Sequence, residues 1–158
     1  MENIPVTAYS GFSNVRGEIT LRKVIENITK GIHAKLIFKI RLLVSQGKME
    51  EANNVKKQLP FYTVTAGYRE KRQAYSITRY THIILLDIDD QPEEKLEGLR
   101  EKINGDPNTL ASFLTPKAHG FKIFVFMRTK YAMALRESLA KTGMDFPTLE
   151  KHHRMMYD

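Results

Sequence analysis

The residues best suited to chemistry in this chain are the aspartates of the segment Leu85-Leu86-Asp87-Ile88-Asp89-Asp90. Alternate residues of a strand project from the same face, so we expect Asp87 and Asp89 to lie side by side and Asp90 to point away. Two neighbouring carboxylates repel each other, and a hard divalent cation such as Mg²⁺ or Mn²⁺ prefers such oxygen ligands. The spacing therefore predicts a metal-binding pair that could support phosphoryl transfer.

The strand that must position these acids is residues 81–88, which are almost continuously apolar. This pattern is typical of a central strand covered on both faces, where an unpaired carboxylate is costly, and it favours a metal role for Asp87. The alternative is a strand that ends in solvent with the acids as a polar fringe. For Asp90 that alternative is preferred, because Asp90 precedes Gln91-Pro92 and a helix predicted over residues 93–103, and would be its N-cap.

A second polar group follows a strand predicted over residues 109–114. It is the loop Thr115-Pro116-Lys117-Ala118-His119-Gly120 and the first residues of the next strand, residues 121–127. Glycine allows the backbone to approach an anion, turn N–H groups can bind phosphate oxygens, and Lys122 supplies a point charge. The pattern predicts a phosphate-binding or nucleotide-binding loop with Thr115, His119, Gly120 and Lys122. An exposed loop histidine and a surface lysine are the open alternatives.

The other elements are expected to mix helices and strands. A strand and turn are predicted within residues 4–16, a helix over 18–30, and helical structure from 33 to 59 with a break at 45–48. A strand is predicted at 61–66 and a further helix at 130–142. Consecutive strands joined by a short loop indicate an α+β fold with a largely antiparallel sheet. The 158 residues fit one domain, 1–158.

The charge balance favours anionic partners, because the chain has a net charge of +7 and a pI near 9.6. Arg69, Lys71 and Arg72 stand among aromatic residues, with Tyr68 before them and Tyr75 after them. Aromatic side chains interleaved with cations can stack bases and bind phosphates, so these residues are predicted to bind nucleic acid. A hairpin tip with solvated side chains is an equally good alternative.

Several functional classes are excluded or disfavoured by composition. Without cysteine, the chain can form neither disulfides nor thiolate metal sites, which fits a cytoplasmic protein. No stretch of 18 apolar residues is present, so we expect neither a membrane span nor a membrane partner. The first residues have neither a basic region nor an apolar region typical of a signal peptide.

The order of these motifs resembles a known family. Leu59-Pro60, a strand ending in Gly67, the Asp87-Ile88-Asp89 strand and the Thr115-Pro116…Gly120-Phe121-Lys122 loop follow one another over roughly residues 20–158. This arrangement is similar to the VirE N-terminal-like domain found in proteins of bacterial mobile elements, especially from Bacteroides-type bacteria. That family is regarded as a divergent branch of the archaeo-eukaryotic primase, or primase-polymerase, superfamily.

The resemblance implies an RRM-like sheet with helices packed on it, built for nucleotidyl transfer. It implies catalytic, metal-binding roles for Asp87 and Asp89 and a nucleotide-phosphate role for Gly120 and Lys122, the latter where many primases have His. The family loop usually reads small-Pro-Ser-Gly-x-Gly-x-Lys, whereas Lys117 and Ala118 stand here in place of Ser-Gly. A third acid, expected as a metal ligand, matches Glu150 or Asp145 near Arg154 in imperfect register.

We therefore expect a primase-polymerase-like nucleotidyltransferase domain that uses Mg²⁺ or Mn²⁺ in DNA replication of a mobile genetic element. Its expected partners are single-stranded or primed DNA and a nucleoside triphosphate, with a helicase or other domain in the same parent protein. The chain would be the N-terminal part of that protein or a shortened form of it. A non-catalytic nucleic-acid-binding module on the same fold is the main alternative, and a dehalogenase-type metal-dependent phosphatase is a weaker one.

Overall fold

The first sheet of the protein combines the N-terminal hairpin with a strand from further along the chain. The computed structural model describes residues 4–10 and 14–126. Strands β1 (Pro5–Ser10) and β2 (Asn14–Thr20) pair antiparallel, and β3 (Phe61–Thr63) pairs with the other edge of β1. The helix predicted from residue 18 begins later, at Leu21, because residues 18–20 still pair with β1. The Thr20 hydroxyl then caps this helix by accepting the Lys23 N–H at 3.2 Å.

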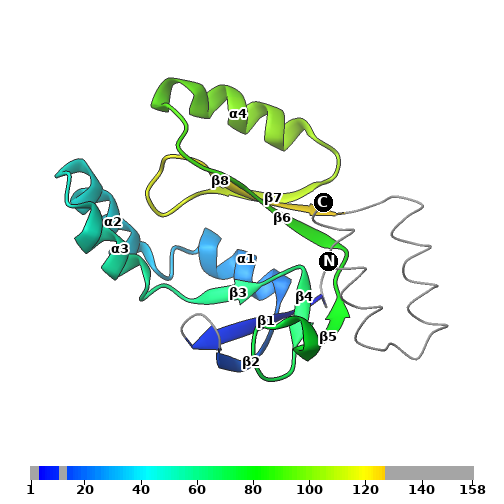
Figure 1. The fold of residues 1–158 in the computed structure, drawn as a ribbon. Coiled ribbons are helices and arrows are strands. Elements are labelled where there is room, and N and C mark those ends of the chain that lie inside the picture. The colour runs from blue at the N-terminus through cyan, green and yellow to red at the C-terminus, as the bar shows by residue number, and fades with distance from the viewer. Residues whose placement is uncertain (1–3, 11–13, 127–158) are drawn as a thin grey trace.

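Three helices follow the hairpin. They are α1 (Leu21–Thr29), α2 (Ala34–Ser45) and α3 (Met49–Lys56), with the predicted break between α2 and α3. Ile40 and Leu43 of α2 pack against Ala52 and Val55 of α3, and these four residues form a small core of their own. Figure 1 shows α2 and α3 as a helical hairpin that projects from the rest of the described chain.

The strand predicted over residues 61–66 is divided between two sheets. Its first part is β3, whereas β4 (Ala66–Tyr68) pairs antiparallel with β5 (Ile77–Tyr80). A short 3₁₀ turn, Ala74–Ser76, lies between β4 and β5. The prediction missed β5.

The third sheet contains both predicted site segments. It consists of β6 (Ile83–Ile88), β7 (Thr109–Leu114) and β8 (Phe121–Phe126), in the order β6-β8-β7 with both pairings antiparallel. The prediction of residues 81–88 as a central strand covered on both faces is wrong, because among the described strands of this sheet β8 is central and β6 lies at an edge. Leu86, in the middle of β6, is 47% exposed.

The two faces of this sheet pack against different layers. Phe121 and Ile123 pack with Ile103 of α4 (Glu93–Gly105), whereas Phe124 belongs to a core shared with α1. This follows the alternation of side chains between the two faces of a strand. Figure 1 shows α4 covering one face, while α1 and the first sheet lie on the other.

The structure confirms an α+β fold whose described strands all pair antiparallel. The strands are distributed over three small sheets instead of one. The RRM-like arrangement implied by the family resemblance stays a prediction. Within the described residues, no helix is both long enough and apolar enough to cross a membrane.

Candidate functional site

The centre of the candidate site is a cross-strand pair. Asp87 of β6 lies opposite Lys122 of β8, two positions along the ladder from the Leu85–Phe124 pair. The Lys122 ammonium group donates a hydrogen bond to Asp87 Oδ2. The structure therefore brings together the carboxylate predicted to bind metal and the cation predicted to bind phosphate, and it places them in direct contact.

This pair is accessible to solvent. The Asp87 side chain is 41% exposed and the Lys122 side chain 27% exposed. The expectation that Asp87 is deeply buried is wrong. Among the described strands β6 lies at an edge of its sheet, and it is buried or half-buried from Ile83 to Leu85 but exposed at Leu86 and Asp87. Asp89 follows the end of β6 and is also exposed. A carboxylate in this position can exchange ligands without the large cost of desolvation.

Gly120 fixes the loop against the acidic end of β6. A Cβ atom built on Gly120 would lie 1.8 Å from the carbonyl oxygen of Ile88 and 3.1 Å from the Cα atom of Asp89. No side chain fits there, because the obstacle is backbone rather than a movable rotamer. The glycine predicted to admit a phosphate is thus needed for close contact between the loop and β6.

The loop before Gly120 is a tight hydrogen-bonded turn. The Thr115 N–H donates to the Gly120 carbonyl, and the Ala118 N–H donates to the Thr115 carbonyl, both at 2.9 Å. Thr115 is buried. Ala118 has φ = 64°, a left-handed conformation that favours glycine. The residue that replaces glycine of the family pattern therefore stands where glycine would be least strained.

His119 lies apart from Lys122. It is exposed and lines a shallow polar hollow beside α4, together with Leu96 and Arg100. Its carbonyl oxygen accepts the Gln91 N–H at 2.8 Å, so the main chain of this residue ties the loop to the start of α4. The predicted loop residues therefore divide between two sides of the sheet, with Lys122 on one and His119 on the other.

Asp90 is not the helix cap that we predicted. Its φ is 52°, a left-handed conformation, and the N-cap position of α4 is Pro92, which has no side-chain cap hydrogen bond. Gln91 stabilises this turn instead, since its side-chain amide donates to the Asp89 carbonyl at 2.9 Å. The sequence Asp90-Gln91-Pro92 therefore forms a turn of its own before the helix begins.

A cavity of about 490 Å³ opens beside Lys122, between the third sheet, α1, α2 and β3. We call it the sheet–helix cavity. Leu85, Phe113 and Phe124 form its sheet wall, and Phe61 and Tyr62 come from β3. Three side chains at the cavity carry or can carry positive charge: Lys122, Arg41 and His33. Sequence reasoning missed His33 and Arg41. The available signal was that residues 33–41 contain three Lys and Arg residues and a histidine but no acid.

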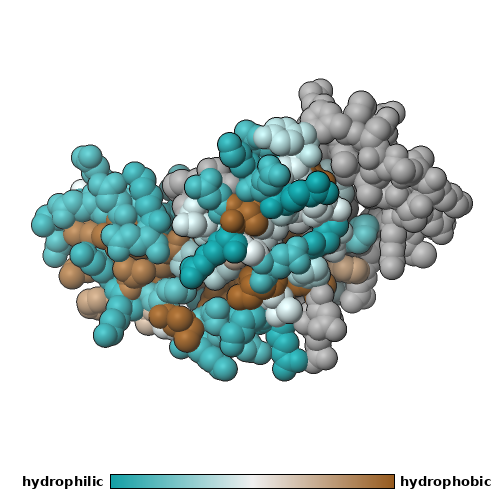
Figure 2. All heavy atoms as spheres, turned by 90° about the horizontal axis from the view of Figure 1, so that it is seen from below, coloured by the Kyte–Doolittle hydropathy of each residue, from teal (hydrophilic) through white to brown (hydrophobic). Residues whose placement is uncertain are grey.

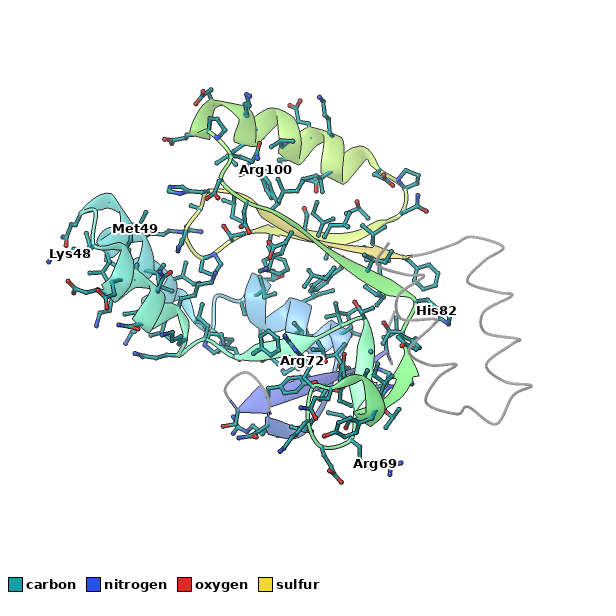
Figure 3. The ribbon with its side chains drawn as sticks, viewed as in Figure 1. Lys48, Met49, Arg69, Arg72, His82 and Arg100 are labelled. Atoms are coloured by element: carbon teal, nitrogen blue, oxygen red, sulfur yellow. The ribbon has the colours of Figure 1, made fainter. Side chains whose placement is uncertain are left out.

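The predicted nucleic-acid-binding residues lie in the β4–β5 connection, and all three are exposed. The Arg72 guanidinium lies over the Phe61 ring at 5.0 Å from its centroid, so Arg72 adjoins a wall of the sheet–helix cavity. The backbone of Lys71 forms an isolated antiparallel β-bridge with that of Asn14. Figure 3 shows Arg72 beside β3 and Arg69 at the lower edge of the molecule, so these two residues lie on different parts of the surface.

A divalent cation would find oxygen ligands of the right kind at Asp87 and Asp89. Within residues 4–10 and 14–126, no third acid or histidine completes a cluster of three ligands. Mg²⁺ often binds through one or two carboxylates and keeps waters and substrate phosphates as its other ligands, so two exposed acids fit such an ion. Glu150, predicted as the third ligand, lies outside the described residues, as do the predicted helix at 130–142, Asp145 and Arg154.

Comparison with known proteins identifies a family for this chain. A family model described as BT4734-like, N-terminal domain matches residues 54–158, which is more than half of the chain and includes Asp87, Lys122 and the loop between β7 and β8. No curated protein and no solved structure gives a significant match. The matched family differs by name from the VirE N-terminal-like family, and the resemblance to that family stays a prediction.

Proposed function

The chain belongs to the BT4734-like N-terminal domain family, and we propose that its described part binds a nucleoside triphosphate with a divalent metal for nucleotidyl transfer on nucleic acid. One observation carries this proposal. Asp87 and Lys122 lie side by side where the loop of residues 115–120 meets the sheet–helix cavity. A metal-binding carboxylate and a phosphate-binding cation must be neighbours to hold a metal–triphosphate complex.

Asp87 and Asp89 would hold Mg²⁺ or Mn²⁺, which neutralises charge on phosphate oxygens during transfer. Lys122 would bind a β- or γ-phosphate once its contact with Asp87 is released. The Lys122 ammonium group and the Asp87 carboxylate compensate each other's charge. The primase-polymerase assignment is our proposal for the reaction that this pair serves.

The test is thermal unfolding with Mn²⁺ and a nucleoside triphosphate. Saturating ligand at about 100 times its dissociation constant stabilises a native protein by about 2.7 kcal/mol, which corresponds to several degrees for a chain of this size. We expect this gain in the wild type and its loss in Asp87→Asn, whereas Lys122→Met should keep the gain from Mn²⁺ alone and lose the further gain from the nucleotide. Asp90→Asn is the matched control, because Asp90 forms neither a hydrogen bond nor an ion pair with the two residues of the pair. An equal shift in Asp87→Asn and the wild type would refute the proposal.

A second function, a non-catalytic nucleic-acid-binding module, is favoured by a different observation. Arg69, Lys71 and Arg72 are exposed near Tyr75, whose side chain is 62% exposed. A steep salt dependence of single-stranded DNA binding, with no shift from metal and nucleotide, would support this function over the first. Hydrolysis of a generic phosphomonoester that Asp87→Asn abolishes would instead support the phosphatase.

A further inference from the structure

The α2–α3 hairpin has an uneven charge distribution. From Lys30 to Lys57, both included, the sequence contains seven Lys and Arg residues and two Glu residues, and both acids stand at the start of α3. Helix α2 therefore contains three cations and no acid. No carboxylate of the described residues forms an ion pair with Lys35, Lys39 or Arg41. This helix presents much of the net positive charge of the protein without internal compensation.

Helix α2 also exposes an aromatic residue. Phe38 is 70% exposed and Leu42 is 46% exposed, whereas Ile40 and Leu43 on the opposite side are buried against α3. Lys35 and Arg41 stand three residues before and after Phe38, and residues three apart are neighbours on a helix surface. Figure 2 shows hydrophobic side chains separated by hydrophilic ones at this end of the molecule. We call Lys35, Phe38, Lys39 and Leu42 the outer face of α2.

The outer face is continuous with the candidate site. Ala34 and Arg41, which adjoin Phe38 on the helix surface, line the sheet–helix cavity that Lys122 also lines. A ligand that follows the cations of α2 therefore reaches Arg41 and then the cavity that Lys122, the partner of Asp87, also lines. The arrangement suits a long polyanion better than a small one, because its positive charges extend along the helix into the cavity.

We propose that the outer face of α2, together with Arg41 beside it, binds single-stranded nucleic acid, with a base stacked on Phe38 and phosphates bound by Lys35, Lys39 and Arg41. Base stacking on an exposed aromatic residue requires an unpaired base, and surrounding cations track the backbone. A membrane surface is a poorer partner. The continuous apolar stripe of α2 is already buried against α3, so the exposed part lacks the wide apolar face of an interfacial helix. This inference rests on the proposed function in taking nucleic acid as the partner.

The experiment measures binding of a fluorescently labelled oligo(dT) by anisotropy over a series of NaCl concentrations, with EDTA present. Removal of a stacking side chain costs about tenfold in affinity. We expect this loss in Phe38→Leu, which keeps an apolar residue, and recovery in Phe38→Tyr. In Lys35→Gln/Lys39→Gln the slope of log affinity against log salt should fall by about 1.4. Lys56→Gln/Lys57→Gln, which removes equal charge from the C-terminal end of α3 and its C-cap, should leave the slope near its wild-type value.

Unchanged oligo(dT) affinity in Phe38→Leu, or an equal loss of slope in both lysine pairs, would overturn the inference. So would binding of phosphatidylserine vesicles without binding of oligo(dT). Phe38 is exposed, so its variants should melt as the wild type does. Because EDTA removes divalent metal, the assay is independent of Asp87. Oligo(dT) binding through α2 with no response to Mn²⁺ and nucleotide would leave this inference standing and refute the proposed function.

Discussion

Lys122 and Asp87 occupy opposite positions on the β8–β6 ladder, and the ammonium group of one binds the carboxylate of the other. A divalent cation at Asp87 must therefore compete with Lys122. The proposed metal ion and the proposed phosphate ligand are linked, because metal at Asp87 releases the lysine and phosphate at Lys122 releases the carboxylate.

Lys122→Met should strengthen Mn²⁺ binding in the absence of nucleotide. A partly exposed ion pair contributes below about 1 kcal/mol, so the gain should reach about fivefold at most. The same variant should lose the further gain that a triphosphate gives the wild type. Titration of Mn²⁺ by electron paramagnetic resonance measures both effects. Lys117→Met is the control, since it removes a nearby charge that makes no ion pair with a described residue, and equal affinities in the two variants would contradict the competition.

Gly120→Ala should destabilise the protein by about 3 kcal/mol or more, because its Cβ would overlap the backbone of Ile88 and neither chain can rotate away. Gly98→Ala is the matched control. A Cβ on Gly98 would meet no atom within 4 Å, and alanine is preferred in a helix by about 1 kcal/mol, so this variant should gain stability. Urea denaturation of both variants gives the two changes. A similar stability of the two variants would show that the loop can move off β6.

Ala118→Gly should stabilise the loop. A left-handed conformation costs alanine about 1–2 kcal/mol, while the greater freedom of glycine in the unfolded chain offsets part of the gain. A net increase of up to about 1 kcal/mol in the free energy of unfolding is expected from denaturation curves. Ala118→Val, whose branched side chain tolerates this conformation poorly, should have the opposite effect. A loss of stability in Ala118→Gly would indicate that the positive φ angle is not strained.

Tyr9 should make the stability of the protein depend on alkaline pH. Burial raises the pKa of this phenol above its ordinary value, despite its contact with the Thr63 hydroxyl at 3.2 Å and the nearby Arg72 charge. Between the ordinary pKa, near 10, and the raised one, the native state binds more protons than the unfolded state. The free energy of unfolding should therefore be unaffected below about pH 10 and fall as pH rises through that range.

Denaturation of wild type and Tyr9→Phe at several alkaline pH values tests this dependence. The variant should lose about 1 kcal/mol near neutral pH, from the missing hydrogen bond, and should fall less steeply with pH than the wild type. The difference between the two curves isolates Tyr9 from the other six tyrosines. Parallel curves would rule out a raised pKa at this position.

Sequence patterns predicted those elements whose signals are local. The break between α2 and α3, the helix α4 and the pair β7–β8 follow from periodicity, proline and glycine. Local patterns do not show which strand lies at the edge of a sheet and which lies in its centre. The apolar run that ends at Leu86 is typical of a central strand, but which strand is central depends on pairing between residues distant in sequence, and β8 takes that place.

The candidate site was predictable in its residues but not in its contacts. Alternation along each strand predicts which neighbours share a face with Asp87 or with Lys122. That these two residues lie opposite each other depends on the register of β6 against β8, which the sequence does not show. Asp90 illustrates the same limit, since its type and position suit a helix cap, but its positive φ angle directs the chain into a separate turn. Arg41 lines the cavity together with residues of α1, β3 and the third sheet, and no local pattern specifies that arrangement.

The position of Gly120 against Ile88 and Asp89 has a practical consequence for experiments on this protein. The spacing between the acidic end of β6 and the loop is set by contact between the backbone at Gly120 and the backbone of Ile88 and Asp89, and it does not depend on side-chain rotamers. Replacement of Asp87, Asp89 or Lys122 therefore deletes a functional group from a scaffold whose dimensions stay constant. Differences among those variants can be interpreted as chemistry at each atom rather than as rearrangement of the loop.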